Sequence, residues 1–182
     1  MRFHLTYEGP LLGATSSFIA PHKHAIRRAF SPQLRKLWEV SPRLQPHDPA
    51  RPNDYDGRLG RWHMHGERFV PLVEEDSGVM CELKVLILRP EAPGSVIHSG
   101  DLDNRIKTVL DALRLPHSSR EIDPSTSDGE PIFCLLQDDA MVERLEVCAD
   151  TLLRPAEKND VHVVIEVSLR PYKGTFGALR FI

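Results

Sequence analysis

The sequence predicts a mixed α/β domain with one mixed sheet and two main helices, and three observations support this. Polar and apolar residues alternate over 2–8 and 161–169, which is the pattern of half-buried strands. Alternation within residues 79–88 gives way to a continuous apolar run, so the far end of this predicted strand is expected to be covered on both faces. Residues 101–113 instead repeat apolar side chains at helical spacing. A chain of this length is expected to form one domain over residues 1–182.

The N-terminal half begins with the strand at 2–8 and continues into a helix predicted over residues 22–39. Pro32 interrupts the apolar pattern of that helix, so two shorter helices are an alternative, the second beginning near this proline. Residues 41–60 are rich in proline, aspartate, arginine and glycine, and we expect them to form a surface loop. A short strand is expected at 69–73.

The C-terminal half is irregular before it returns to strands. Residues 114–137 carry many turn-forming side chains, and within them 133–136 predict either a short buried strand or a helix. Strands are expected at 141–149 and 161–169. The tail, residues 171–182, predicts an arm or an additional edge strand.

The composition narrows the class of protein. The net charge is −3 and the pI about 6.3, so any nucleic-acid site must rest on a local patch of basic residues. Cys81, Cys134 and Cys148 lie far apart and form no CxxC pair, which predicts reduced, mostly buried thiols and a cytoplasmic protein. The N-terminus lacks the apolar core of a signal peptide, and no apolar run is long enough to span a membrane.

Basic side chains cluster densely in one place only, on the polar side of the first predicted helix. The cluster consists of Lys23, Arg27, Arg28, Arg35 and Lys36. A solvated helix face is the ordinary interpretation of this cluster, and a surface for DNA phosphates is the functional one. His63 and His65 raise a similar choice, because histidines at i, i+2 suit a metal site but also occur as ordinary strand residues.

Two acidic pairs carry the most specific chemical signal. Asp101 and Asp103 stand at the start of the second predicted helix, and Lys107 follows Asp103 by one turn. Asp138 and Asp139 come directly before the strand that follows the irregular segment. If the two pairs meet in space, three or four carboxylates converge with one lysine, a set suited to holding Mg²⁺ against a phosphodiester.

Each of these residues also has a purely structural interpretation. Asp103 suits a helix N-cap, and with Lys107 it makes an ordinary i, i+4 ion pair worth about 0.3–0.5 kcal/mol. Asp111 is expected to face solvent or to pair with Lys107. Asp138 and Asp139 by themselves are typical of a turn before a strand. Spacing alone therefore does not establish an enzyme.

A resemblance to a known family favours the functional interpretation. Two stretches, Asp101-Leu102-Asp103-Asn104-Arg105-Ile106-Lys107 (continued by Asp111-Ala112-Leu113) and Asp138-Asp139-Ala140-Met141-Val142, resemble the two motifs of the RusA-type Holliday-junction resolvases, small endodeoxyribonucleases often carried by prophages. The resemblance implies a homodimer of mixed α/β subunits that requires Mg²⁺ and hydrolyses phosphodiesters in branched DNA during recombination and repair.

The resemblance also assigns roles to individual residues. The catalytic residues that it implies are Asp101, Asp103, Lys107 and Asp139, and the Mg²⁺ ligands are Asp101, Asp103, Asp139 and Asp138. We expect DNA contacts from Lys23, Arg27, Arg28, Arg35, Lys36 and Arg105. A dimer presents two such sites, which suits symmetric nicking of a four-way junction.

The chain departs from the family pattern in three respects. Residues near 40–76 and 114–137 look like insertions, and the chain is slightly acidic where family members tend to be basic. A non-catalytic DNA-binding or scaffold protein that retains the RusA-like fold is therefore the main alternative. A third hypothesis is a metal-dependent hydrolase of small phosphate compounds, which predicts a closed pocket instead of an open groove.

Overall fold

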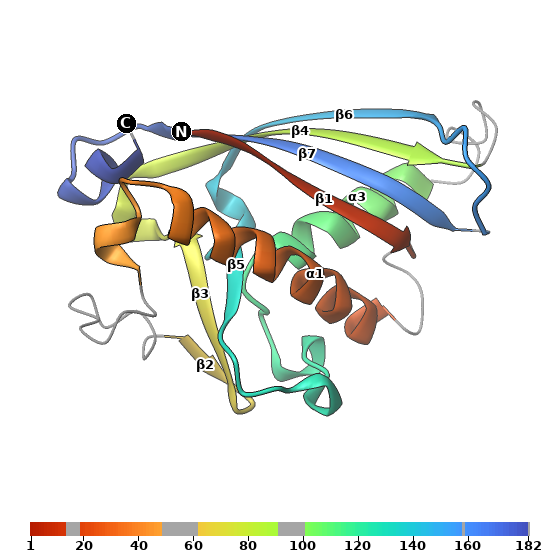
Figure 1. Ribbon diagram of the computed structural model, residues 1–182, viewed down its shortest axis with the longest axis horizontal. Coiled ribbons are helices and arrows are strands. Elements are labelled where there is room, and N and C mark those ends of the chain that lie inside the picture. Colours follow the sequence, from red (N-terminus) through yellow and green to blue (C-terminus); the bar gives the residue numbers. More distant parts are fainter. Residues whose placement is uncertain (14–18, 49–61, 91–100, 158, 182) are drawn as a thin grey trace.

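The computed structural model describes residues 1–13, 19–48, 62–90, 101–157 and 159–181 (Figure 1). The α-helices are α1 (Ile19–Val40) and α3 (Asp101–Leu113), and the strands are β1 (Arg2–Pro10), β2 (Trp62–Met64), β3 (Glu67–Val73), β4 (Val79–Arg89), β5 (Ile132–Leu136), β6 (Val142–Thr151) and β7 (Asp160–Pro171). Short 3-10 helices connect several of them, including η3 (Ser119–Glu121) and η5 (Asp139–Met141), and η6 (Phe176–Phe181) follows β7. The expected 41–60 loop lies outside the described residues from position 49 onward.

The main sheet holds its four strands in the order β1-β7-β4-β6. Strand β7 pairs antiparallel with β1 and β4, whereas β6 runs parallel to β4. Ile165 of β7 lies opposite Leu5 of β1 and Val85 of β4, and Val85 lies opposite Val147 of β6. Directly paired residues share one face of a sheet, and Leu5, Val85 and Ile165 are all buried. The apolar residues that alternate with polar ones along these strands therefore form the face that the helices cover.

A second, smaller sheet has the order β2-β3-β5, with β3 and β5 parallel. The mixed α/β fold with two main helices is confirmed, but its strands divide between two sheets instead of forming one. The undecided segment 133–136 is part of strand β5, where all five residues are buried. This segment adopts an extended conformation because it pairs with β3, in a register that places Val70 beside Phe133.

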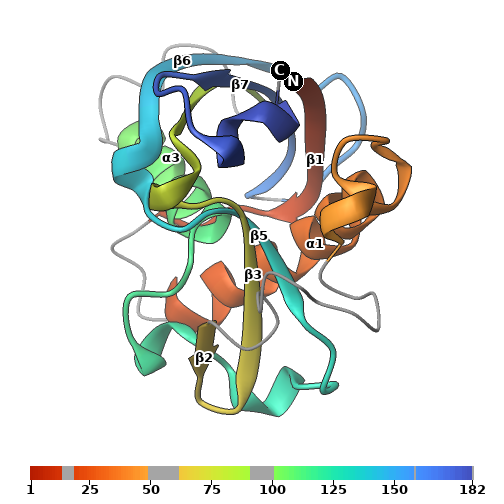
Figure 2. The same cartoon turned by 90° about the vertical axis from the view of Figure 1, so that its left-hand side faces the viewer.

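Helices α1 and α3 pack against the same face of the main sheet (Figures 1 and 2). Ile26, Phe30, Leu34 and Trp38 follow one another at i, i+4 along α1, and all four are buried. The alternative of two shorter helices is wrong, because α1 runs through Pro32 as one helix. The proline ring is exposed, and the buried stripe continues on both sides of it.

The C-terminal tail is neither an arm nor an edge strand over its described residues. It ends as η6, which buries Ala178 and Phe181 against the core. The terminal ammonium of Met1 donates hydrogen bonds to the carbonyl oxygens of Phe181 (2.8 Å) and Leu169 (3.2 Å), so the two ends of the chain meet. Among the described helices, none is long and apolar enough to cross a membrane.

Candidate metal centre and nucleic-acid surface

The first acidic pair stands at the N-terminal end of α3. Asp101 begins this helix, and its side chain lies outside the described part of the structure. Asp103 and Lys107 are exposed, while Ile106 and Val109 are buried on the side that faces the core. The amphipathic pattern of the helix therefore directs the motif carboxylate and lysine toward solvent, where they are accessible to a large substrate.

The second acidic pair sits at η5, directly before β6. Asp138 caps this turn, since its Oδ1 accepts a hydrogen bond from the backbone N–H of Ala140 (2.9 Å), and its Oδ2 lies 3.0 Å from Nε2 of His117. The backbone hydrogen bond from Ala140, followed by the bond from His117, lowers the pKa of Asp138. Asp139 is half exposed, and its Oδ2 lies 3.9 Å from Nε of Arg114.

The two acidic pairs lie at opposite ends of α3 (Figure 1). At about 1.5 Å per residue, Asp103 is roughly 15 Å from the last residue of the helix, and Asp139 lies beside Arg114, directly after that end. Within the described residues, no three His, Cys, Asp or Glu side chains come close enough to share one metal ion. Among the described side chains of one chain the two pairs therefore do not converge, and the side chain of Asp101 lies outside that set.

Strand β5 causes this separation. The chain leaves α3, crosses the irregular segment and returns through β5, whose parallel pairing with β3 sets its direction. At the end of β5, Leu136 forms a bridge with Arg114, and its carbonyl oxygen accepts a hydrogen bond from the backbone N–H of Leu115 (3.0 Å). Asp138 and Asp139 follow at once, so they are held at the C-terminal end of α3.

Asp111 is neither exposed nor paired with Lys107, which corrects both sequence-based interpretations of this residue. It is buried, and its carboxylate lies 2.5 Å from Nζ of Lys23 and 2.7 Å from the Arg114 guanidinium. Burial on its own raises the pKa of Asp111, but the hydrogen bonds and charges of Lys23 and Arg114 outweigh burial and hold it below its usual value.

Three of the residues expected to contact DNA are structural. The side chain of Arg27 is fully buried and donates hydrogen bonds to the carbonyl oxygens of Asp111 (2.8 Å) and Arg114 (3.0 Å). Lys23 is largely covered by its ion pair with Asp111, and Arg105 is buried. The packing of α1 against α3 withdraws Lys23 and Arg27 from solvent, and Arg105 is buried on α3, so these three residues offer little surface to DNA phosphates, contrary to the expectation.

The other three expected DNA contacts remain at the surface but have acidic partners. Arg28 pairs with Asp128, and Arg35 lies 3.2 Å from Glu39 and 3.0 Å from Asp48. Lys36, the most exposed at 68%, is 3.2 Å from Glu39. These carboxylates offset the basic charge, so this face of α1 offers less attraction to phosphate than the count of arginines and lysines predicts.

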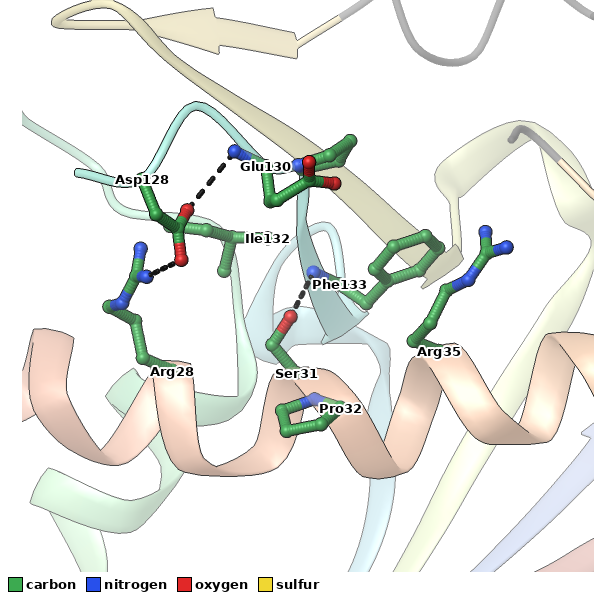
Figure 3. Close-up of a pocket in the computed structure, with 9 residues that line it drawn as sticks. Arg28, Ser31, Pro32, Arg35, Asp128, Glu130, Ile132 and Phe133 are labelled. Atoms are coloured by element: carbon green, nitrogen blue, oxygen red, sulfur yellow. Dashed lines mark hydrogen bonds and ion pairs between the residues drawn. The ribbon is translucent and has the colours of Figure 1, made fainter.

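Figure 3 shows a pocket of about 380 Å³ between α1 and the start of β5. Arg28 and Arg35 stand at its two sides, and the guanidinium of Arg35 lies over the ring of Phe133, 5.3 Å from its centre. The hydroxyl of Ser31 accepts a hydrogen bond from the backbone N–H of Phe133 (2.8 Å) and ties the helix to the strand. Arg28 pairs with Asp128, and Arg35 pairs with Glu39 and Asp48, so neither basic side chain among the described lining residues is free for an anionic ligand.

The His63 and His65 pair does not form a metal site with other described side chains. His63 is exposed on β2, and His65 occupies the left-handed region (φ 51°) in the tight turn to β3. Two residues that the sequence did not single out share a pocket with His63. His117 and Gln137 line a second pocket with it, and they are separated from it in sequence by more than fifty residues, so no local pattern signals them.

No protein-family model matches this chain, and no curated protein matches it at a significant level. The resemblance to RusA-type resolvases therefore depends on the motif residues of α3 and η5 and on the order of the elements that carry them.

Proposed function

We propose that this protein is a Mg²⁺-dependent endonuclease that hydrolyses phosphodiesters in branched DNA, with the four-way junction of recombination and repair as its substrate. The observation that carries the proposal is the exposed motif at the start of α3, where Asp103 and Lys107 face solvent one helical turn apart and Asp101 precedes them. The order of elements supports it, since a buried strand, the motif helix, an acidic pair and two closing strands follow one another as the resemblance implies.

The residues at the start of α3 fit Mg²⁺ in the chemistry of their donors. Magnesium is commonly held by one or two carboxylates together with waters and substrate phosphate, so Asp101 and Asp103 are a sufficient protein contribution. The bound ion would offset charge that develops on the phosphate and lower the pKa of a coordinated water. In this proposal Lys107 contacts the scissile phosphate.

The second acidic pair fits Mg²⁺ less well. Each carboxylate oxygen of Asp138 already accepts one hydrogen bond, from His117 or from Ala140, and only the remaining lone pairs could serve a metal ion. Asp139 is accessible, but the positive charge of Arg114 lies nearby. We therefore keep Asp139 as a proposed catalytic residue whose contribution must be measured separately from that of Asp103.

A homodimer is part of the proposal, and β6 is the surface that supports it. This strand ends the main sheet, beside β4 alone among the described strands, and exposes Arg144, Leu145 and Glu146. If two copies pair antiparallel about Leu145, each Arg144 lies opposite Glu146 of the other copy. Opposite charges at directly paired positions stabilise such a sheet, and a twofold axis forms the contact twice.

The test is cleavage of a labelled four-way junction, beside a three-way branch and a linear duplex, in Mg²⁺ and in EDTA. We expect paired nicks in the four-way junction in Mg²⁺ only, and a loss of rate of about 100-fold or more in Asp103→Asn. Glu157→Gln, which changes an exposed acid in the loop before β7, is the matched control and should cleave normally. Retained cleavage by Asp103→Asn contradicts the role of that residue.

Asp139→Asn separates two versions of the proposal. If it cleaves like the wild type, the metal is held at the start of α3 alone. If it loses activity as Asp103→Asn does, carboxylates from both ends of the helix act together in the complex with DNA.

A non-catalytic DNA-binding protein remains the second candidate, because Asp103 and Asp139 lie at opposite ends of α3 within a single chain. That candidate predicts tight binding of the junction, with a steep loss of affinity as salt rises, and no cleavage in Mg²⁺.

A further inference from the structure

A pocket of about 270 Å³ lies between the β2–β3 hairpin and the segments that follow α3 and β5. Its lining includes Trp62, Phe69, Leu115, His117, Gln137 and Asp138. Pockets for drug-sized ligands occupy about 300–1,000 Å³, so this pocket suits a single ring system. It adjoins the acidic pair of η5, since Asp138 forms part of its wall.

The apolar wall of this pocket is rich in flat side chains. Trp62 and Phe69 lie opposite each other in the register of β2 and β3. Phe69 and Leu115 belong to a small buried cluster, and Trp62 packs against that cluster while remaining partly exposed. An aromatic wall that is supported from behind and open in front is the surface on which a planar heteroaromatic ring stacks.

The polar wall holds hydrogen-bonding groups with defined roles. The Oε1 of Gln137 accepts a hydrogen bond from the backbone N–H of Glu75 (3.0 Å), which orients the amide and leaves its NH₂ group as a donor. His117 lies 3.0 Å from Asp138 through Nε2, so in its neutral form Nδ1 is an acceptor. The Asp138 carboxylate has further acceptor capacity beyond the two hydrogen bonds that it makes.

We propose that this pocket binds an unpaired adenine or cytosine, a nucleobase whose exocyclic amino group stands beside a ring-nitrogen acceptor, with its ring stacked on Trp62 and its polar edge between Gln137 and the His117–Asp138 pair. Adenine and cytosine each present an amino donor beside a ring-nitrogen acceptor, which complements the acceptors of Asp138 and His117 and the donor of Gln137. Thymine has no amino group. The carboxylate of Asp138 repels phosphate, so the base enters this pocket and the backbone stays outside.

The inference rests on the proposed nuclease function for the source of the base, which would be a nucleotide unstacked at the branch point of a DNA junction. Binding of a free nucleoside does not need that function, so the two proposals fail separately. The pocket also gives a role to the β2–β3 hairpin, which lies in a region that the sequence marks as an insertion.

The experiment is titration of the full-length protein with adenosine, cytidine and thymidine, followed by tryptophan fluorescence. The chain has two tryptophans, and Trp38 is fully buried, so a response on ligand binding reports on Trp62. We expect saturable quenching by adenosine and cytidine, with thymidine at least fivefold weaker. Tyr172→Leu, which removes an exposed aromatic ring in the C-terminal tail, is the matched control and should bind like the wild type.

Two variants test the two walls of the pocket. Trp62→Leu should abolish the fluorescence response and weaken binding by about tenfold or more in a calorimetric titration, because stacking on the indole is lost. Gln137→Ala leaves the aromatic wall intact and should reduce the preference for adenosine and cytidine over thymidine. Circular dichroism confirms that each variant is folded.

Three results would overturn the inference. They are the absence of a saturable response at the solubility limit of the nucleosides, equal affinity for thymidine, and unchanged affinity in folded Trp62→Leu. A junction with one unpaired adenine or cytosine at its centre, bound in EDTA, gives the second arm of the test. The wild type should prefer it to a fully paired junction, and Trp62→Leu should not. Nucleoside binding without any junction binding supports the pocket and contradicts the nuclease.

Discussion

Replacement of Arg27 by methionine tests whether the basic side of α1 serves the fold or DNA. The Arg27 guanidinium is buried and donates hydrogen bonds to the carbonyl oxygens of Asp111 (2.8 Å), Arg114 (3.0 Å) and Glu121 (3.5 Å). It also lies 3.6 Å from the Glu121 carboxylate. Methionine retains the apolar stem of the side chain and removes all of these polar contacts.

The expected loss follows from the two shortest bonds. A hydrogen bond from a charged group contributes about 1.5–3 kcal/mol, so the two bonds together contribute about 3–6 kcal/mol, and removal of one member of a buried ion pair costs about 3–5 kcal/mol. These ranges overlap, and Arg27→Met should therefore lower the free energy of unfolding by about 3–5 kcal/mol. Such a loss is a large part of the stability of a typical domain.

Urea denaturation followed by circular dichroism measures this free energy. Arg28→Met is the matched control, because Arg28 is the next residue of the same helix and pairs with exposed Asp128. A surface ion pair contributes about 0–1 kcal/mol, so the control should lose no more than that. Two results together would refute the structural role of Arg27. The first is a loss of unfolding free energy below about 1 kcal/mol in Arg27→Met. The second is a salt slope of DNA binding that falls by the amount expected for about one lost phosphate contact.

Two further predictions concern pH and assembly. Burial, and then the charges of Arg27 and Arg28, lower the pKa of His24 from 6.5 to about 4. Between these two pH values the unfolded chain therefore binds more protons at His24 than the folded protein does. Wild-type stability should therefore fall by about 2 kcal/mol between about pH 7.5 and about pH 5, and urea denaturation should show that His24→Leu lacks this loss. Arg144→Glu places like charges opposite each other across paired β6 strands and should weaken a dimer about tenfold in analytical ultracentrifugation. The double variant Arg144→Glu, Glu146→Arg should restore the dimer affinity. If neither the single nor the double variant changes that affinity, the dimer is not formed through β6.

Local patterns in the sequence determined the elements that surround the candidate site. The apolar spacing of Ile106, Val109 and Leu113 predicted α3, and these residues are buried in it. The apolar run at 79–88 and the alternation at 161–169 predicted β4 and β7 within a residue or two. These signals are reliable because each depends on residues a few positions apart, which share one face of a helix or strand.

The tertiary structure alone decided which of the charged residues remain available for function. A helical wheel places Lys23 and Arg27 on the polar side of α1, but α3 packs beside these two residues and supplies the carboxylate of Asp111. The partners are more than eighty residues apart, so local spacing carries no information about their contact. Burial of a charge requires such a partner, and a single sequence does not identify it.

The same reason explains the separation of Asp103 from Asp139. Each carboxylate is evident in the sequence, and the exposed position of Asp103 on α3 follows from the pattern of that helix. The position of Asp139 depends instead on the parallel pairing of β5 with β3 and on the bridge from Leu136 to Arg114. Non-local backbone hydrogen bonds of this kind decide which end of α3 the second acidic pair approaches. The chemistry of the residues and the local elements can therefore be predicted from the sequence, whereas long-range pairing sets the distances between the functional side chains.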